Sequence, residues 1–106
     1  MPNQVAETIL QQLGGRRFIT MTGAHSFTGD KDALIFKVPR TMTRENIAGV
    51  KISLMPTDTY IMEFYAFRGS LKAGNYRCDV VTKREDVYWD CLQDVFSDVT
   101  GLATML

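Results

Sequence analysis

Residues 58 to 67 read Asp-Thr-Tyr-Ile-Met-Glu-Phe-Tyr-Ala-Phe and predict a strand with two different faces. Side chains along a strand point alternately to its two sides. One side carries the set expected of a core: Tyr60, Met62, Phe64 and Ala66. The other side carries three large apolar side chains, Ile61, Tyr65 and Phe67, beside Thr59 and Glu63. A face left wholly to water usually shows fewer such side chains, so this second face is the best functional indication in the sequence.

This strand forms the second half of a predicted β-hairpin over residues 50 to 67. Apolar and polar residues alternate over residues 50 to 55. Met55-Pro56-Thr57-Asp58 then predicts a tight turn, because proline presets the backbone angle required at its second position. Further strands are expected from β-branched and aromatic runs at residues 17–22, 33–38 and 76–81, with a loop over residues 23–32.

Apolar residues recur at helical spacing near both ends of the chain. Residues 3 to 13 predict a short helix that ends at Gly14-Gly15. Residues 83 to 100 predict a longer one, preceded by a T-x-x-E capping box in which Thr82 and Glu85 each satisfy a backbone donor of the first turn. The apolar stripe of this second helix is expected to comprise Val87, Tyr88, Cys91, Leu92, Val95, Phe96 and Val99.

These elements predict an α+β fold and one domain over residues 1–106. The expected architecture is a single antiparallel sheet of four or five strands, with the N-terminal and the long C-terminal helix packed on one face. Two helices can cover only one face of a sheet. The face with Ile61, Tyr65 and Phe67 is then either covered by loops or by curling of the sheet, or it is a binding surface. For a binding surface, homodimerisation is the simplest outcome, since one self-complementary patch suffices.

Charge is balanced in total but segregated along the chain. Twelve basic and twelve acidic residues cancel, which argues against a strong non-specific polyanion binder. Residues 37–84 carry most of the basic side chains, whereas residues 85–106 carry acidic ones and none that are basic. Within the predicted C-terminal helix, acids four residues apart form a ridge: Asp86, Asp90, Asp94 and Asp98. Such a ridge is either solvated, paired with the basic middle of the same chain, or a docking surface for a basic partner.

Nucleic-acid binding is the alternative that the sequence leaves open. Tyr65 and Phe67 on an open sheet face resemble, in kind, the stacking platforms that hold single strands. The aromatic-glycine signature of RNA-recognition sheets is absent. Gly14-Gly15-Arg16-Arg17 could hold an anion, although it is not a P-loop. The basic residues considered for this alternative are Arg16, Arg17, Arg40, Arg44 and Lys51.

The sequence predicts no enzyme, no cofactor and no metal site. His25 is the sole histidine, and its neighbour Ser26 does not make a catalytic triad. Cys78 and Cys91 have no CxxC spacing and indicate reduced thiols. The sequence shows no signal peptide and no segment long enough to span a bilayer, so a cytoplasmic protein is expected.

Several runs resemble a group of small proteins, without an assigned activity, encoded by bacteriophages, prophages and other mobile elements. These runs are residues 9–15, 18–24, 58–60, 92–96 and 99–102. The resemblance covers most of the chain and implies expression in the cytoplasm of a bacterial host, but it implies no activity and no site residues. Because small phage proteins often act on host machinery, it favours an accessory protein that binds a host protein or itself. The partner-binding residues expected from the sequence are Ile61, Tyr65, Phe67, Asp90, Asp94 and Asp98.

Overall fold

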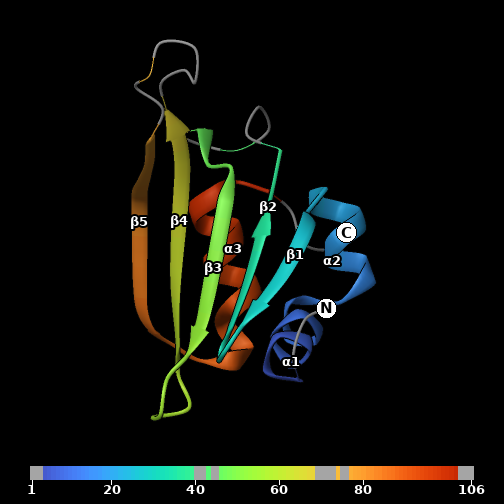
Figure 1. The fold of residues 1–106 in the computed structure, drawn as a ribbon. Helices are drawn as coiled ribbons and strands as arrows, with labels where there is room; N and C mark the ends of the chain where they lie inside the picture. Colours follow the sequence, from blue (N-terminus) through green and yellow to red (C-terminus); the bar gives the residue numbers. More distant parts are fainter. Residues whose placement is uncertain (1–3, 40–42, 44–45, 69–73, 75–76, 103–106) are drawn as a thin grey trace.

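The computed structural model of the chain describes residues 4–39, 43, 46–68, 74 and 77–102. It contains one open antiparallel sheet in which each strand pairs with its neighbours in sequence, in the order β1-β2-β3-β4-β5 (Figure 1). The strands are β1 (His25–Asp30), β2 (Ala33–Lys37), β3 (Gly49–Leu54), β4 (Tyr60–Arg68) and β5 (Arg77–Val87). The helices are α1 (Gln4–Leu13), α2 (Arg16–Thr22) and α3 (Leu92–Thr100), the last preceded by the 3-10 turn η3 (Trp89–Cys91). The predicted α+β class is confirmed.

The hairpin of β3 and β4 has the predicted register. Val50 pairs with Phe64 and Ile52 pairs with Met62, so the apolar sets of both strands share one face. The turn is closed by two backbone hydrogen bonds, from Met55 N to Thr59 O (2.8 Å) and from Asp58 N to Met55 O (3.0 Å). This face is buried completely: Met62 and Phe64 are 0% exposed.

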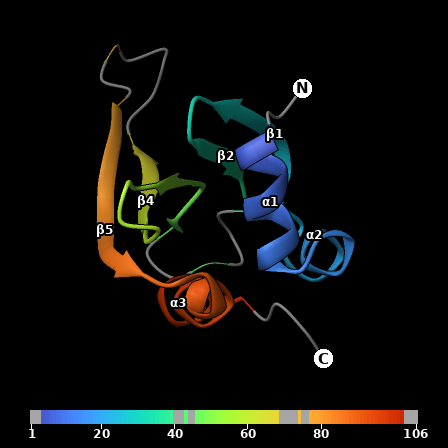
Figure 2. The same ribbon diagram turned by 90° about the horizontal axis from the view of Figure 1, so that it is seen from below.

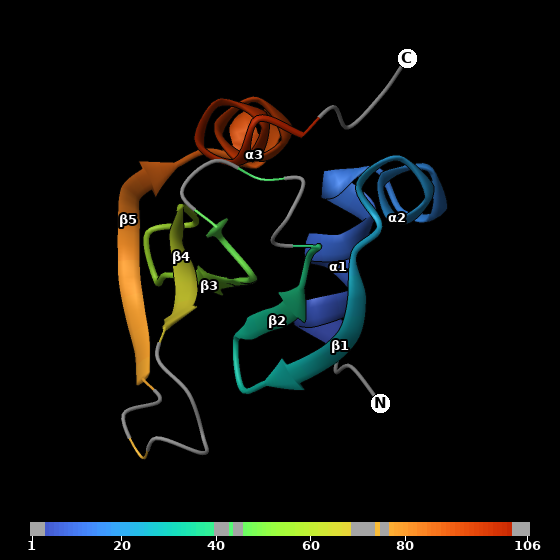
Figure 3. The same ribbon diagram turned by 90° about the horizontal axis from the view of Figure 1, so that it is seen from above.

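The helices in the described part of the chain all lie on the side of the sheet that carries this apolar set. Seen along the strands, α1 and α2 lie against the β1–β2 half and α3 lies beside the β4–β5 half, with no described helix on the opposite side (Figures 2 and 3). Two hydrogen bonds hold α1 in this layer. Tyr60 Oη of β4 donates to Gln12 Oε1 (2.8 Å), and Gln93 Nε2 of α3 donates to the carbonyl of Leu13 (2.7 Å).

A cluster of buried phenylalanines joins the helices to the sheet. The ring of Phe18 in α2 lies 5.6 Å from that of Phe36 in β2 and 4.9 Å from that of Phe96 in α3, both in edge-to-face geometry. Phe96 also lies 6.4 Å from Phe64 of β4. Such aromatic pairs contribute about 0.5–1.5 kcal/mol each beyond their burial. Four elements that are distant in sequence therefore meet at one ring cluster.

The expected strand over residues 17–22 is wrong, because these residues form helix α2. Its sequence is rich in β-branched and aromatic residues, which weakly favour a strand. Packing overrides that preference: Phe18 is buried in the ring cluster, and the Thr22 hydroxyl donates to the Phe18 carbonyl one turn earlier (2.7 Å). Gly23 ends the helix in the left-handed conformation, with its N–H bonded to Ile19 O. The expected loop that follows is also wrong in part, since residues 25–30 pair with β2 as the edge strand β1.

The expected helix over residues 83–100 begins later than predicted. Strand β5 continues to Val87, so Thr82 and Glu85 lie in a strand and form no capping box. Pairing with β4 accounts for this, because Thr82 lies opposite Phe64 and Val87 lies opposite Tyr60. A register irregularity between these two pairs accommodates Asp86, whose φ of 54° is left-handed. The regular α-helix comprises Leu92–Thr100 only.

Candidate functional site

The candidate site is the sheet face turned away from the helices, called here the outer face. Strand register assigns its side chains, because directly paired residues project to the same side. One row across the sheet is Lys37, Gly49, Tyr65 and Val80; the next is Ile35, Lys51, Glu63 and Lys83. Ile35, Lys51, Glu63 and Tyr65 are half-buried by their neighbours, whereas Lys37, Lys83 and Val80 are exposed. No helix or strand within the described ranges covers this face.

Gly49 creates a hollow in the outer face. It has no side chain to fill the space between Lys37 of β2 and Tyr65 of β4, its two partners in register. The resulting hollow has a volume of about 240 Å³. Its lining residues are Ile35, Phe36, Lys37, Gly49, Val50, Lys51, Tyr65 and Cys78. An apolar floor with lysines at its border suits an apolar or aromatic group carried by an acidic partner.

Glu63 organises the polar part of this face. It lies in register between Lys51 and Lys83, and opposite charges directly across strands are favourable. Burial raises the pKa of the Tyr65 hydroxyl, and the nearby Glu63 carboxylate, which also accepts its hydrogen bond, raises it further. Tyr65 therefore stays neutral at physiological pH. The exposed cations on this face beside it are Lys37 and Lys83.

Ile61 lies on the same face as Tyr65 but lines a different hollow. Four residues along a strand separate the two side chains by about 13 Å. The second hollow, of about 320 Å³, lies between the β3–β4 turn and the end of β5. Its lining residues are Met55, Pro56, Thr57, Thr59, Ile61, Glu85 and Asp86. The predicted partner-binding residues Ile61 and Tyr65 thus share a face but not a pocket.

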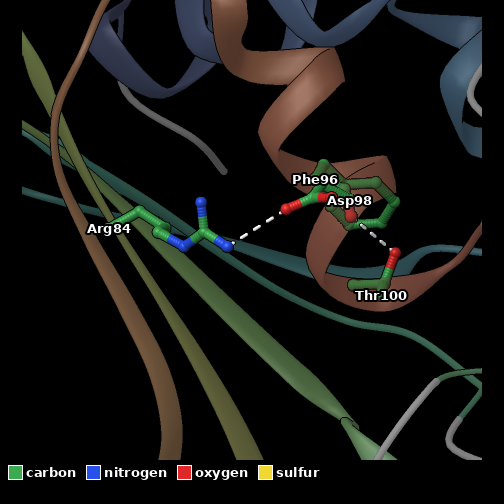
Figure 4. Close-up of polar contacts among 4 residues, drawn as sticks. All are labelled: Arg84, Phe96, Asp98 and Thr100. Atoms are coloured by element: carbon green, nitrogen blue, oxygen red, sulfur yellow. Dashed lines mark hydrogen bonds and ion pairs between the residues drawn. The ribbon is translucent and has the colours of Figure 1, made fainter.

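The predicted acidic ridge is not formed, because its residues belong to three different elements. Asp86 lies in β5, Asp90 in η3, and only Asp94 and Asp98 lie on α3. Arg84 Nη2 of β5 lies 3.1 Å from Asp98 Oδ2, while within α3 the Thr100 hydroxyl donates to the Phe96 carbonyl (Figure 4). Asp98 is therefore paired with the basic middle of its own chain. Both partners are exposed, so this bond contributes little to stability.

An exposed aromatic pair was missed by the sequence analysis. Tyr88 and Trp89 lie where β5 gives way to η3, and each is 61% exposed. Tyr88 was expected in the apolar stripe of a helix over residues 83–100, whereas it lies just after β5. Trp89 is the sole tryptophan of the chain. Exposed Trp and Tyr side chains are enriched among residues that dominate protein interfaces. Only the position of Trp89 outside the apolar stripe could have drawn attention to it.

Of the basic residues of the nucleic-acid alternative, the three that the structure describes are not all brought together. Arg16 and Arg17 are exposed on α2, in the helix layer, whereas Lys51 lies on the outer face. Arg40 and Arg44 lie outside the described residues, as does the side chain of Phe67, whose backbone belongs to β4. The lysines that do accompany Lys51 on the outer face are Lys37 and Lys83.

The described residues with reactive side chains include His25, Ser26 and the two cysteines. His25 Nδ1 lies 2.9 Å from Ser26 Oγ, but both side chains are exposed on the edge strand β1. Burial raises the pKa of the Cys78 thiol, with a further contribution from Asp79, and the pKa of Cys91 is raised in the same way beside Asp90. A raised pKa lowers the thiolate fraction and hence reactivity. Within the described ranges, no group of three His, Cys, Asp or Glu side chains could hold a metal ion.

Comparison with protein-family models, with curated proteins and with solved structures gives no match. A separate test of the helices finds none, within the described part of the chain, that combines the length and apolar character needed to cross a membrane.

Proposed function

We propose that the chain is a small, non-enzymatic binding protein that associates with a second copy of itself through the outer face. One observation carries this proposal. The three helices among the described residues pack on the same side of the five-stranded sheet, and the opposite side presents Ile35, Ile61 and Tyr65 around two hollows. Complete burial of an apolar side chain contributes about 1.5–3 kcal/mol, and these side chains are only partly buried in the single chain.

The biological setting is part of the proposal. The resemblance to proteins of phages and mobile elements favours an accessory protein that works in the cytoplasm of a bacterial host. Such a role needs recognition of a protein surface and no chemistry of its own. The raised thiol pKa values and the exposed position of the His25–Ser26 contact are consistent with a protein that binds without catalysis.

Replacement of Tyr65 tests the proposal. Tyr65→Ala removes the ring that borders the Gly49 hollow, so we expect weaker self-association in sedimentation velocity. Tyr65→Phe keeps the ring and is the matched control; it should associate like the wild type. Equal association of all three proteins would contradict the assignment of the contact to this face.

Nucleic-acid binding is a second candidate, favoured by the lysines that flank Tyr65. Lys37, Lys51 and Lys83 would contact phosphates while the ring stacks on a base. This candidate predicts retention of single-stranded oligonucleotides at low salt and a steep loss of retention as salt rises. Absence of retention at low salt would exclude it.

A further inference from the structure

We infer that self-association is head-to-tail: the exposed Tyr88–Trp89 pair of one copy docks at the Gly49 hollow of the next. This inference rests on the proposed function and names the surface that the outer face recognises. It follows from where the two features lie, from their chemistry and from the charges around them.

The two features lie toward opposite ends of the sheet. Gly49 is the first residue of β3 and pairs with Tyr65, far along β4. Val87, which precedes the aromatic pair, is opposite Tyr60 at the start of β4. Five residues of strand correspond to about 17 Å. The ribbon shows the same arrangement, with β5 leading away from the start of β3 toward the start of α3 (Figure 1). A chain therefore does not fill its own hollow, but it can fill that of a neighbour.

The chemistry of the two features is complementary. Trp89 and Tyr88 expose aromatic surface, and the hollow of about 240 Å³ has an apolar floor bordered by the ring of Tyr65. Aromatic side chains that enter a preformed apolar pocket are the usual anchors of a protein interface. Aromatic rings also pair favourably in edge-to-face geometry, which Tyr65 can provide.

Charge complementarity favours this occupant. The aromatic pair lies among exposed acids of its own copy, Glu85, Asp86, Asp90 and Asp94, while Lys37 and Lys51 border the hollow. The Lys83–Glu85 ion pair, with 3.7 Å between Nζ and Oε1, is too exposed to neutralise this acidic surface. Face-to-face contact between two outer faces would instead bring their lysines together, and like charges in a contact are unfavourable.

Head-to-tail contact has a consequence that a two-fold dimer lacks. Each copy uses two different surfaces, so it can bind one neighbour at each end, and assembly continues to a ring or a chain. The donor variant Trp89→Ala loses one surface, and the acceptor variant Lys37→Glu/Gly49→Thr loses the other. Trp89 and Lys37 are exposed, and Gly49 has no side chain. Both variants are therefore expected to fold, and circular dichroism checks this.

Mixing the two variants provides the test. Alone, each should associate about 30-fold or more weakly than the wild type, because each lacks a central anchor or its pocket. Mixed in equal amounts, they should form a dimer of twice the 12.0 kDa chain mass and nothing larger, because the donor of one fits the acceptor of the other. Trp89 emission, from the acceptor variant only, should shift to the blue on mixing. Arg17→Glu on α2, in the helix layer, is the charge-matched control for Lys37→Glu and should assemble like the wild type.

The outcomes separate this inference from the proposed function. If the wild type associates but the mixed variants stay monomeric, the head-to-tail mode is wrong and self-association stands. If the wild type is monomeric at every concentration, both are wrong. In that case, loss of oligonucleotide retention in the acceptor variant would assign the hollow to nucleic acid, and unchanged retention would exclude that use as well.

Discussion

Gly49→Thr should raise the stability of the protein while it weakens self-association. Glycine in a strand interior is unfavourable, because it loses more backbone freedom on folding than other residues and offers no side chain for cross-strand contact. Gly49 is not one of the described glycines with positive φ, so its backbone accommodates a side chain. That side chain would project from the outer face, between Lys37 and Tyr65.

Gly49→Thr should affect stability and self-association in opposite directions. Replacement of glycine by a β-branched residue in a strand stabilises by about 1 kcal/mol, which corresponds to a rise of about 4–8 °C in the unfolding temperature. The same change places a hydroxyl and a methyl group in the hollow of about 240 Å³. Loss of a seated aromatic anchor costs about 2 kcal/mol, or about 30-fold in affinity.

Urea unfolding and sedimentation velocity measure the two effects on the same samples. Ser53→Thr is the matched control: it lies on the outer face of the same strand, away from the hollow, and should leave association unchanged. A destabilised Gly49→Thr would refute the outward placement of this position. A stabilised Gly49→Thr with unchanged association would show that the hollow is not the contact.

Three further predictions concern stability. Phe96→Ala should lower the free energy of unfolding by about 3–5 kcal/mol, since its ring lies beside rings of three other elements; a loss under 1 kcal/mol by urea unfolding would contradict the ring cluster as the core. Arg84→Ala should cost no more than about 1 kcal/mol, because the pair with Asp98 is exposed; the same titration tests it, and a larger loss would contradict this reasoning. The pKa of Tyr65 is raised in the folded state. Its contribution to the free energy of unfolding is therefore complete below pH 10 and is lost as the pH rises through the pKa of the folded state. Tyr65→Phe should therefore lose less stability than the wild type between pH 8 and pH 11, and equal losses would contradict the perturbed hydroxyl.

The structure could be predicted from the sequence where several local signals indicated the same element. In the β3–β4 hairpin, alternation and turn chemistry indicate the same structure, and the register puts both apolar sets on one face. The number of predicted helices was also enough to predict that helices cover only one face of the sheet. The outer face of β4 was therefore predictable, but the hollow was not, because it depends on Gly49 lying opposite both Lys37 and Tyr65.

The sequence was insufficient where distant contacts override local preference. Thr82 and Glu85 match a capping box, yet pairing of this segment with β4 makes it a strand. Phe18 belongs to a run of β-branched and aromatic residues, yet this run forms a helix in which Phe18 is buried against Phe36 and Phe96. Trp89 became a candidate only when the shift in the helix start exposed it. The structure of these segments depends on contacts with elements distant in sequence, which a local sequence pattern does not reveal.

The most direct test of the outer face as a contact surface is the molar mass of the unmodified protein at increasing concentration, measured by light scattering. We expect a weight-average mass that rises from 12.0 kDa as concentration increases and continues past that of a dimer or stops at a closed ring. A mass that stays at 12.0 kDa throughout would contradict it.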